Sequence, residues 1–292
     1  MTSSSLNTSF LSRADAGLAA VLTAGAALVV SLLVLIVLLL FKESWPVLNH
    51  FGFSKFFLDS SWYPSEGLFG LQAMLFASVA CALGAVVLGA PLGIASALFC
   101  RFYAPPSLAR SYRRLLELLA GIPSVVFGFW GLTVLVPIIG AWQPPGASLF
   151  TGMLILMLMI LPTIALTSVT ALESVPVAYL NGAMALGLAR KAVILKVALP
   201  AARGGIWMGI LLSAARALGE TMAVVMVSGN VIRMPQSLFD PVRTLTANIA
   251  LEMAYAVGDH RAALYVSGLL LTAAVAALAL LALRFTKGAA HA

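Results

Sequence analysis

Charged side chains are the scarcest feature of this sequence. Asp, Glu, Lys and Arg make up only 9% of its 292 residues, whereas about a quarter of the residues in a typical soluble domain are charged. Hydrophobic residues reach 62%, which excludes an ordinary water-soluble fold. We therefore expect an all-α integral membrane protein. The net charge of +7 does not indicate nucleic-acid binding, because the basic residues lie mainly in short segments between apolar runs.

Cysteine and histidine are also rare. Cys81 and Cys100 lie in or at the end of one apolar run and form no Cys/His cluster, so neither a disulfide framework nor a metal site is supported. His50, His260 and His291 lie far apart in the sequence. The chain also lacks a Gly-x(4)-Gly-Lys-[Ser/Thr] loop and a Gly-x-Ser-x-Gly elbow. We accordingly expect no catalytic residue, no cofactor and no nucleotide-binding site in this chain.

Apolar runs long enough for six membrane crossings remain, at about 20 residues for each crossing. The expected segments are a flexible N-terminal stretch (1–15), a first transmembrane helix (16–41), an external loop (42–66), a core with five further transmembrane helices (67–287) and a C-terminal tail (288–292). A cleaved signal peptide is the alternative for the first run. The apolar part of such a peptide usually spans about 7–15 residues, which is much shorter than this run.

Six crossings place both termini on the same side of the membrane, and the basic residues indicate which side. The larger group of Lys and Arg shares the side of the termini and consists of Arg13, Arg101, Arg110, Arg113, Arg114, Arg190, Lys191, Lys196, Arg203, Arg284 and Lys287. The smaller group consists of Lys42, Lys55, Arg233, Arg243 and Arg261. Because basic residues are enriched in cytoplasmic loops, we expect both termini in the cytoplasm.

The cytoplasmic segment 176–203 is too long to be a loop without secondary structure. Apolar residues recur at helical spacings on both sides of Gly187. We expect two short helices joined by a glycine bend, the second of them stopped by Pro200. An apolar ridge on the cytoplasmic side favours docking of a partner, and the alternative is an amphipathic helix that lies on the lipid surface.

Two charged residues lie inside the run 204–232, which we expect to form the fifth transmembrane helix. Arg216 and Glu220 are four residues apart, so on a helix they share one face. Charge at membrane depth is unfavourable, and one interpretation is a structural ion pair that neutralises itself. The other is that Arg216 offers a planar set of donors to an oxyanion crossing the membrane. Glu220 would then hold the guanidinium while the path is empty.

The sequence Ala-Gly-Ile-Pro-Ser at 120–124 falls near the start of the uncharged stretch 118–172. The simpler interpretation of Gly121 and Pro123 is a helix kink with close packing. The alternative is a break in the helix, so that backbone donors or Ser124 face a substrate path. Five residues at 142–146, Trp-Gln-Pro-Pro-Gly, indicate a turn between the third and fourth helices.

The 176–203 segment also carries a family resemblance. Gly187 is followed after nine residues by Val197, and after one more by Leu199-Pro200. This pattern resembles the cytoplasmic signature of binding-protein-dependent ABC importer permeases, which reads E-A-A-x(3)-G-x(9)-I-x-L-P. The opening triplet falls on Asn181-Gly182-Ala183, where two of the three residues differ, and Leu186 directly precedes the glycine.

Longer stretches narrow the resemblance. Residues 117–131 and 216–224 are similar to the permeases of the high-affinity phosphate ABC importer. Residues 246–252 and the Trp-Pro and Trp-Tyr-Pro sequences at 45–46 and 62–64 look most like the C-type of its two permease subunits. The resemblance runs from about residue 41 to residue 285.

The resemblance implies a type I ABC importer permease fold that moves inorganic phosphate by alternating access. It implies that 176–203 is the coupling segment, seated in a groove of a cytoplasmic ATPase. It also implies three partners: a related A-type permease subunit, an ATPase dimer that uses ATP and Mg²⁺, and an extracytoplasmic phosphate-binding protein.

The alternatives are a permease for another oxyanion, a stand-alone secondary transporter or channel, and a membrane-embedded enzyme. A permease for another oxyanion, such as molybdate or sulfate, would use the same Arg216, because one guanidinium does not distinguish tetrahedral anions. A stand-alone secondary transporter or channel would commonly show inverted repeats, and no convincing internal repeat is visible. A membrane-embedded enzyme would need a cluster of catalytic side chains at one membrane face, and none is visible.

Overall fold

A computed structural model describes residues 13–289, with side chains described for residues 15–284. The expected flexible stretch at 1–15 and the tail at 288–292 therefore lie largely outside the described residues. The helices are α1 (Arg13–Phe51), α2 (Phe53–Leu58), α3 (Gln72–Leu98), α4 (Pro106–Ala120), α5 (Ser124–Trp130), α6 (Val136–Trp142), α7 (Leu149–Glu173), α8 (Val177–Ala185), α9 (Arg190–Val193), α10 (Leu199–Gly219), α11 (Met222–Val227), α12 (Leu245–Glu252) and α13 (Gly258–Ala289).

Short elements complete the chain. They are the strands β1 (Trp62–Tyr63) and β2 (Leu68–Phe69), the 3-10 turn η2 (Pro64–Glu66), and the π-helical turns η3 (Phe99–Tyr103), η4 (Gly131–Leu135) and η5 (Ile194–Ala198). The π turn η4 joins α5 to α6 and η5 joins α9 to α10, whereas η3 extends α3 to Tyr103. Turns of this kind are frequently found at functional sites.

Six helical segments in the described residues are long and apolar enough to cross a membrane, which confirms the predicted fold class. They are Asp15–Phe51, Gln72–Tyr103, Ser124–Trp142, Leu149–Glu173, Arg190–Gly219 and Gly258–Arg284. The first differs from the expected 16–41, because its helix continues through Pro46 to Phe51 and so includes the start of the expected loop. The third begins at Ser124 instead of residue 118, because α4 is a separate helix.

Helix α7 forms the centre of the bundle. In its most apolar stretch 61% of the residues are buried, against none in that of α1. Small residues allow its neighbours to approach closely. A Cβ atom at Gly93 of α3 would lie 2.8 Å from Ile164 of α7, and one at Gly209 of α10 would lie 2.1 Å from the Thr167 hydroxyl. The backbones of α3, α7 and α10 are thus packed as one unit.

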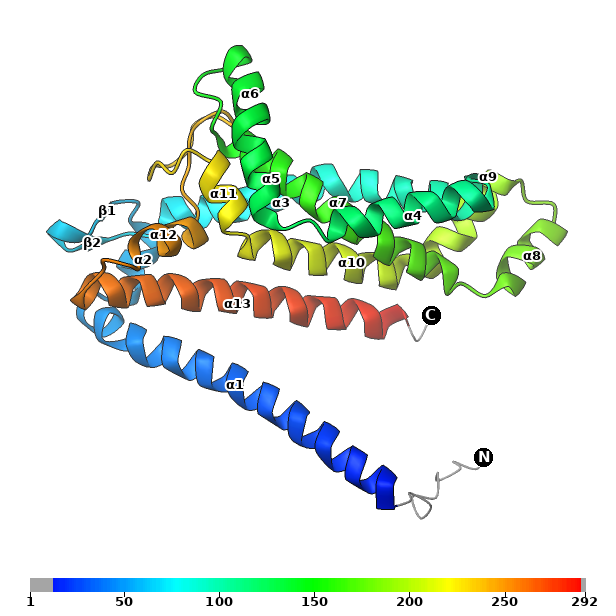
Figure 1. Ribbon diagram of the computed structural model, residues 1–292, viewed down its shortest axis with the longest axis horizontal. Helices are drawn as coiled ribbons and strands as arrows, with labels where there is room; N and C mark the ends of the chain where they lie inside the picture. The colour runs from blue at the N-terminus through cyan, green and yellow to red at the C-terminus, as the bar shows by residue number, and fades with distance from the viewer. Residues whose placement is uncertain (1–12, 290–292) are drawn as a thin grey trace.

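The two ends of the bundle differ in structure (Figure 1). One end, called the α12 end below, carries α2, the β1–β2 hairpin and α12, whereas the α8 end carries α8 and α9. In the hairpin Trp62 pairs with Phe69, and both rings pack with Phe56, Leu71 and Leu245 in a small second core. This core attaches the α12 end to α1 and α13.

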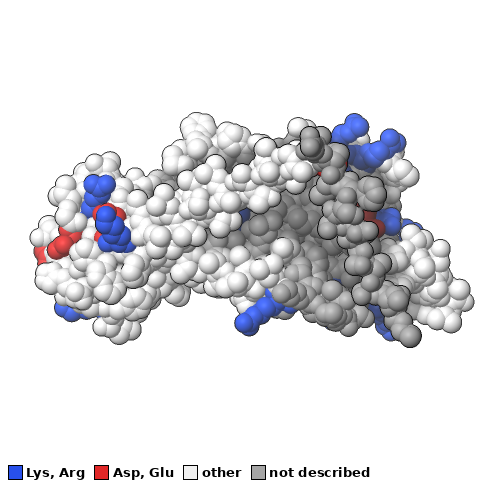
Figure 2. Space-filling model, turned by 90° about the horizontal axis from the view of Figure 1, so that it is seen from below, with Lys and Arg blue, Asp and Glu red and all other residues white. Residues whose placement is uncertain are grey.

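Helix α1 is peripheral. It contacts the bundle mainly through α13, and it diverges from α13 toward the α8 end (Figure 1). Charged side chains are sparse over the middle of the face shown in Figure 2 and gather mostly toward its two ends. This distribution is expected of a protein whose middle lies in hydrocarbon.

Candidate functional site

Arg216 lies in the last turn of α10 with an exposed side chain. Its Nη1 atom donates to Oγ1 of Thr163 on α7, at 3.4 Å. This is the one hydrogen bond of the Arg216 guanidinium within the described part of the chain. Most of its five donors therefore remain available to a ligand or to another subunit. Thr163 had no signal in the sequence, because it lies 53 residues from Arg216.

Glu220 does not continue the α10 helix. Its backbone is extended, with φ −69° and ψ 130°, and α11 begins only at Met222. The expectation of one helix over 204–232 with Arg216 and Glu220 on one face is therefore wrong. No ion pair joins the two side chains among the ion pairs of the described residues.

The break at Glu220 is held by hydrogen bonds that replace helical ones. The Glu220 carboxylate accepts from the N–H of Ala223 at 3.3 Å, which serves the first turn of α11. The Glu220 carbonyl accepts from the hydroxyl of Thr246 at 2.9 Å. Irregular backbone at membrane depth is tolerated only where protein covers it or where it lines a water-filled cavity. The contacts with Ala223 and Thr246 provide such cover at Glu220.

A second break lies nearby. Helix α4 ends at Ala120 and α5 begins at Ser124, with Pro123 in an extended conformation (ψ 140°) between them. The helix is thus broken at this point, not merely kinked. Ser124 is half-buried at the first position of α5.

Helices α5 and α11 begin at these two breaks and lie side by side. A Cβ atom at Gly128 would lie 2.8 Å from Cα of Ala223, and one at Gly131 would lie 2.9 Å from Val227. From Gly128 to Gly131 the neighbour changes from Ala223 to Val227, so residue numbers increase along both helices in the same direction. The two helices are therefore parallel. The two breaks consequently lie at the same end of this helix pair, as Figure 1 also shows. Paired interruptions of this kind are typical of substrate sites in transporters.

The coupling-like segment has the expected bend. Helix α8 ends at Ala185, and Gly187 has φ +80°. The N–H of Gly187 donates to the Met184 carbonyl and that of Leu188 to the Ala183 carbonyl. These two bonds are those of a Schellman motif, which requires a left-handed residue at the glycine position.

The second half of the segment differs from expectation. Pro200 does not stop a helix, because it lies in the first turn of α10, which directly follows the π turn η5. The π turn η5 joins α9 to α10, so that the helix continues from Arg190 to Gly219. At 1.5 Å per residue, Arg190 and Arg216 lie about 39 Å apart along one helix.

The signature residues divide into two groups by exposure. Asn181, Gly182, Leu186, Gly187 and Pro200 are exposed, whereas Ala183 is buried and Val197 and Leu199 are half-buried. The Leu186 side chain is 82% exposed, and Val177, Tyr179 and Met184 of α8 are also exposed. An apolar ridge of this kind on a protein end is typical of a docking surface.

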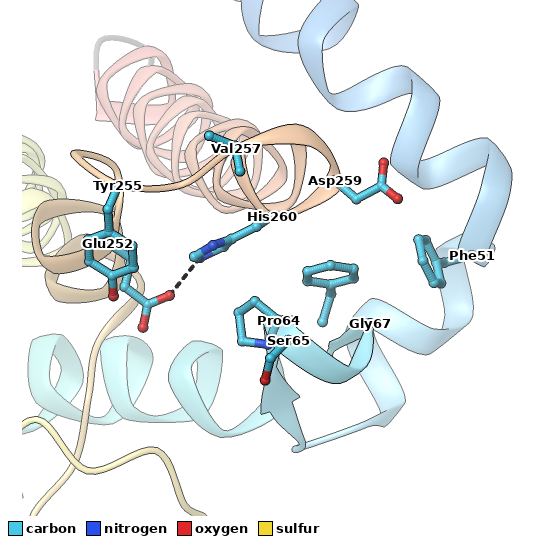
Figure 3. A pocket seen from close by; sticks show the side chains of 10 residues that line it. Phe51, Pro64, Ser65, Gly67, Glu252, Tyr255, Val257, Asp259 and His260 are labelled. Atoms are coloured by element: carbon cyan, nitrogen blue, oxygen red, sulfur yellow. Dashed lines mark hydrogen bonds and ion pairs between the residues drawn. The ribbon is translucent and has the colours of Figure 1, made fainter.

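Glu252, the last residue of α12, is buried and not solvated. Its carboxylate is buried and accepts from Trp62 Nε1 at 2.9 Å and from Arg243 Nη1 at 2.6 Å. It also lies 2.8 Å from His260 Nε2. Figure 3 shows this His260 contact at the wall of a pocket of about 540 Å³. Trp62 lies 190 residues from Glu252, so no local pattern indicated the cluster.

Comparisons with known proteins show the family of this chain. The family model described as "Binding-protein-dependent transport system inner membrane component" matches residues 89–288. The chain is 38% identical to the phosphate transport system permease protein PstC of Mesorhizobium japonicum, over 88% of this chain and 85% of that protein. It is 33% identical to the PstC protein of Pasteurella multocida over 78% of each chain. It is also 42% identical to a probable ABC transporter permease protein of Bacillus subtilis, YqgH, over 69% of this chain and 66% of that protein.

A solved structure has the same fold. One chain of the MetNI methionine ABC transporter in an inward-facing conformation superposes with a TM-score of 0.63 at 16% identity, over 78% of this chain and 99% of that one. The helical bundle, the paired breaks and the family match over residues 89–288 agree with one another. The chain is therefore a multi-pass membrane protein that belongs to the binding-protein-dependent transport system inner membrane components, the permease subunits of ABC transporters.

Proposed function

We propose that this chain is a permease subunit of an ATP-driven importer of inorganic phosphate. The observation that carries the proposal is the position of Arg216, whose guanidinium is exposed beside the break between α10 and α11. Arginine provides a planar fork of donors that matches phosphate oxygens. Relatives named as phosphate permeases, 33–38% identical over most of the chain, support phosphate as the substrate.

In this proposal the α8 end faces the cytoplasm and the α12 end faces outward. The exposed ridge of α8, with Leu186 82% exposed, docks on an ATPase dimer, which binds ATP and Mg²⁺ in place of this chain. A second, related permease covers the exposed side of Arg216 and completes the path. A phosphate-binding protein docks at the α12 end and delivers the substrate.

The continuous helix from Arg190 to Gly219 accounts for the coupling of energy to transport. When ATP closes the ATPase dimer, α8 moves and displaces the start of this helix. The displacement reaches Arg216 because a helix is stiff along its axis, and the path opens outward. Hydrolysis then restores the inward-facing state. Phosphate alone produces no net uptake, because a ligand shifts a conformational equilibrium without driving a cycle.

Glu220 stabilises the break between α10 and α11 and does not pair directly with the Arg216 guanidinium. Its carboxylate binds the N–H of Ala223 and keeps a negative charge close to the path. That charge weakens phosphate binding enough to allow release, as conduction requires. Ser124 and Pro123 contribute the second break, which keeps the opposite wall of the same region free of regular helix.

The test is transport by the assembled complex. The chain is co-expressed with its candidate ATPase and second permease, reconstituted in vesicles with a phosphate-binding protein, and supplied with ATP and radiolabelled phosphate. ATP-dependent uptake that unlabelled phosphate suppresses and sulfate or molybdate does not would support the proposal. Uptake suppressed by molybdate or sulfate alone would identify another oxyanion as the substrate. Failure to co-purify any ATPase would overturn the proposal.

A further inference from the structure

A bidentate ion pair at the α8 end joins two helices that the sequence separates. Arg113 of α4 donates through Nη1 to Oε1 of Glu173 at 3.0 Å and through Nη2 to Oε2 at 3.2 Å. Glu173 is the last residue of α7, four residues before α8 begins at Val177. Fork-to-fork pairs of this kind fix the relative orientation of the two groups as well as their distance.

The Arg113–Glu173 pair fixes the position of α4 relative to the end of α7 more than it stabilises the fold. The Arg113 and Glu173 side chains are 35% and 44% exposed, and ion pairs at such exposure contribute little to the free energy of unfolding. The hydrogen bonds that Arg113 donates to the Glu173 carboxylate raise the pKa of the Arg113 guanidinium above its usual value. Arg113 therefore remains charged throughout the physiological pH range.

Arg113 also has a second acceptor within reach. Its Nε atom lies 4.0 Å from Oε1 of Glu117, one turn further along α4. If the end of α7 moves away, the guanidinium can turn to Glu117 without becoming an unpaired charge. An element with two such arrangements can transmit a conformational change.

The Arg113–Glu173 pair lies between α8 and the break at residues 121–123. On one side, Glu173 precedes α8, the proposed docking helix. On the other side, α4 leads through the break at 121–123 into α5, which packs against α11 beside Glu220. This route is separate from the continuous α9–α10 helix. It reaches the other wall of the path through α4 and α5.

We propose that the Arg113–Glu173 pair couples movement of α8 to the break between α4 and α5, so that both walls of the path respond to the ATPase together. Arg113 and Glu173 are positioning residues in this scheme and touch neither substrate nor nucleotide. The inference rests on the proposed function, because it needs an ATPase docked on α8.

The experiment uses the full reconstituted importer and measures phosphate taken up per ATP hydrolysed. Glu173→Gln and Arg113→Gln each leave the partner in place without its opposite charge. We expect uptake per ATP to fall by about tenfold, a factor typical of coupling between linked sites, while the ATPase still co-purifies. Arg114→Gln is the matched control, since Arg114 neighbours Arg113 on α4 and lies outside the pair, and it should behave as the unmodified protein.

The exchanged variant Arg113→Glu with Glu173→Arg restores the pair with reversed polarity. Recovery of uptake per ATP in this variant, after loss in both single variants, would support coupling through the pair. An unchanged ratio in both Gln variants would overturn it, and so would an equal loss in Arg114→Gln. If a variant fails to assemble, recovered assembly and coupling in the exchanged variant supports the proposal, and continued failure contradicts it. Absence of ATP-driven phosphate uptake in the unmodified complex would instead count against the proposed function.

Discussion

Thr246 donates its hydroxyl hydrogen to the backbone carbonyl of Glu220 across 2.9 Å. This contact ties α12, the helix at the α12 end, to the break that follows Arg216. Helix α12 is itself anchored at its other end by Glu252, which binds Trp62, Arg243 and His260. The break is thus connected to Glu252 at the α12 end through one short helix.

Replacement of Thr246 by Val should weaken the hold on this break. The substitution keeps the side-chain shape but leaves the Glu220 carbonyl without its donor, at a cost of about 1–3 kcal/mol. We expect phosphate uptake to fall by about tenfold, which corresponds to about 1.4 kcal/mol. Thr246→Ser retains the hydroxyl and should transport normally. Equal uptake in the two variants would show that the contact has no role in transport.

Substitutions of Arg216 and Glu220 test the candidate site directly. Arg216→Lys keeps the charge but loses the planar fork that binds two oxyanion oxygens, so we expect uptake to fall by about tenfold or more. Glu220→Gln removes the charge beside the path and should slow release of phosphate. Both are measured in properly assembled complexes with radiolabelled phosphate. Normal uptake in both variants would remove Arg216 and Glu220 from the path.

The bend at Gly187 should not tolerate proline. Proline holds φ near −65°, whereas Gly187 has φ +80°, so Gly187→Pro would redirect α8 relative to α9. We expect the loss of ATP hydrolysis stimulated by substrate and binding protein. Ala189→Pro is a matched control, because Ala189 already has φ −61°. Substrate stimulation that survives Gly187→Pro would place the coupling contact elsewhere.

The cluster of Glu252, Trp62, Arg243 and His260 should stabilise the folded protein. Glu252→Gln leaves Arg243 without its counter-charge in a setting where the two side chains are 10% and 17% exposed. Breaking a buried pair of this kind costs about 3 kcal/mol, and we expect a clear fall in Tm in detergent. Asp259→Asn changes a charge at the same pocket but outside the cluster, and its Tm should change little. A Tm unaffected by Glu252→Gln would mean that the four side chains contribute nothing to folding.

The loop at 236–240 should depend on pH through Asp240. Hydrogen bonds from the N–H groups of Gln236 and Ser237, together with Arg233, lower the pKa of Asp240 below its usual value. The stabilisation is therefore present above the ordinary Asp pKa, about 3.9, and is lost as pH falls through the lower folded value. Amide exchange of Gln236 and Ser237, corrected for its intrinsic pH dependence, should report this loss. The same measurement on Asp240→Asn should show no such transition.

The sequence by itself determined the class of the protein and its six crossings. Hydropathy is a local property, because a spanning helix satisfies its backbone hydrogen bonds within its own segment, and so the runs could be counted without a structure. The glycine bend at 187 was predictable for the same reason. A left-handed residue between two helical patterns depends on the nearest neighbours alone.

Only the tertiary structure decided where the helices are interrupted and which charges meet. The helix of Arg216 ends at Gly219 because Ala223 and Thr246 supply the hydrogen bonds of the break, and Thr246 lies 26 residues away from Glu220 in the sequence. Glu252 is buried in part by Trp62, which lies 190 residues away in the sequence and donates a hydrogen bond to its carboxylate. Such contacts depend on packing between distant segments. They place Arg216 beside a break in the backbone, where the sequence predicted a continuous helix.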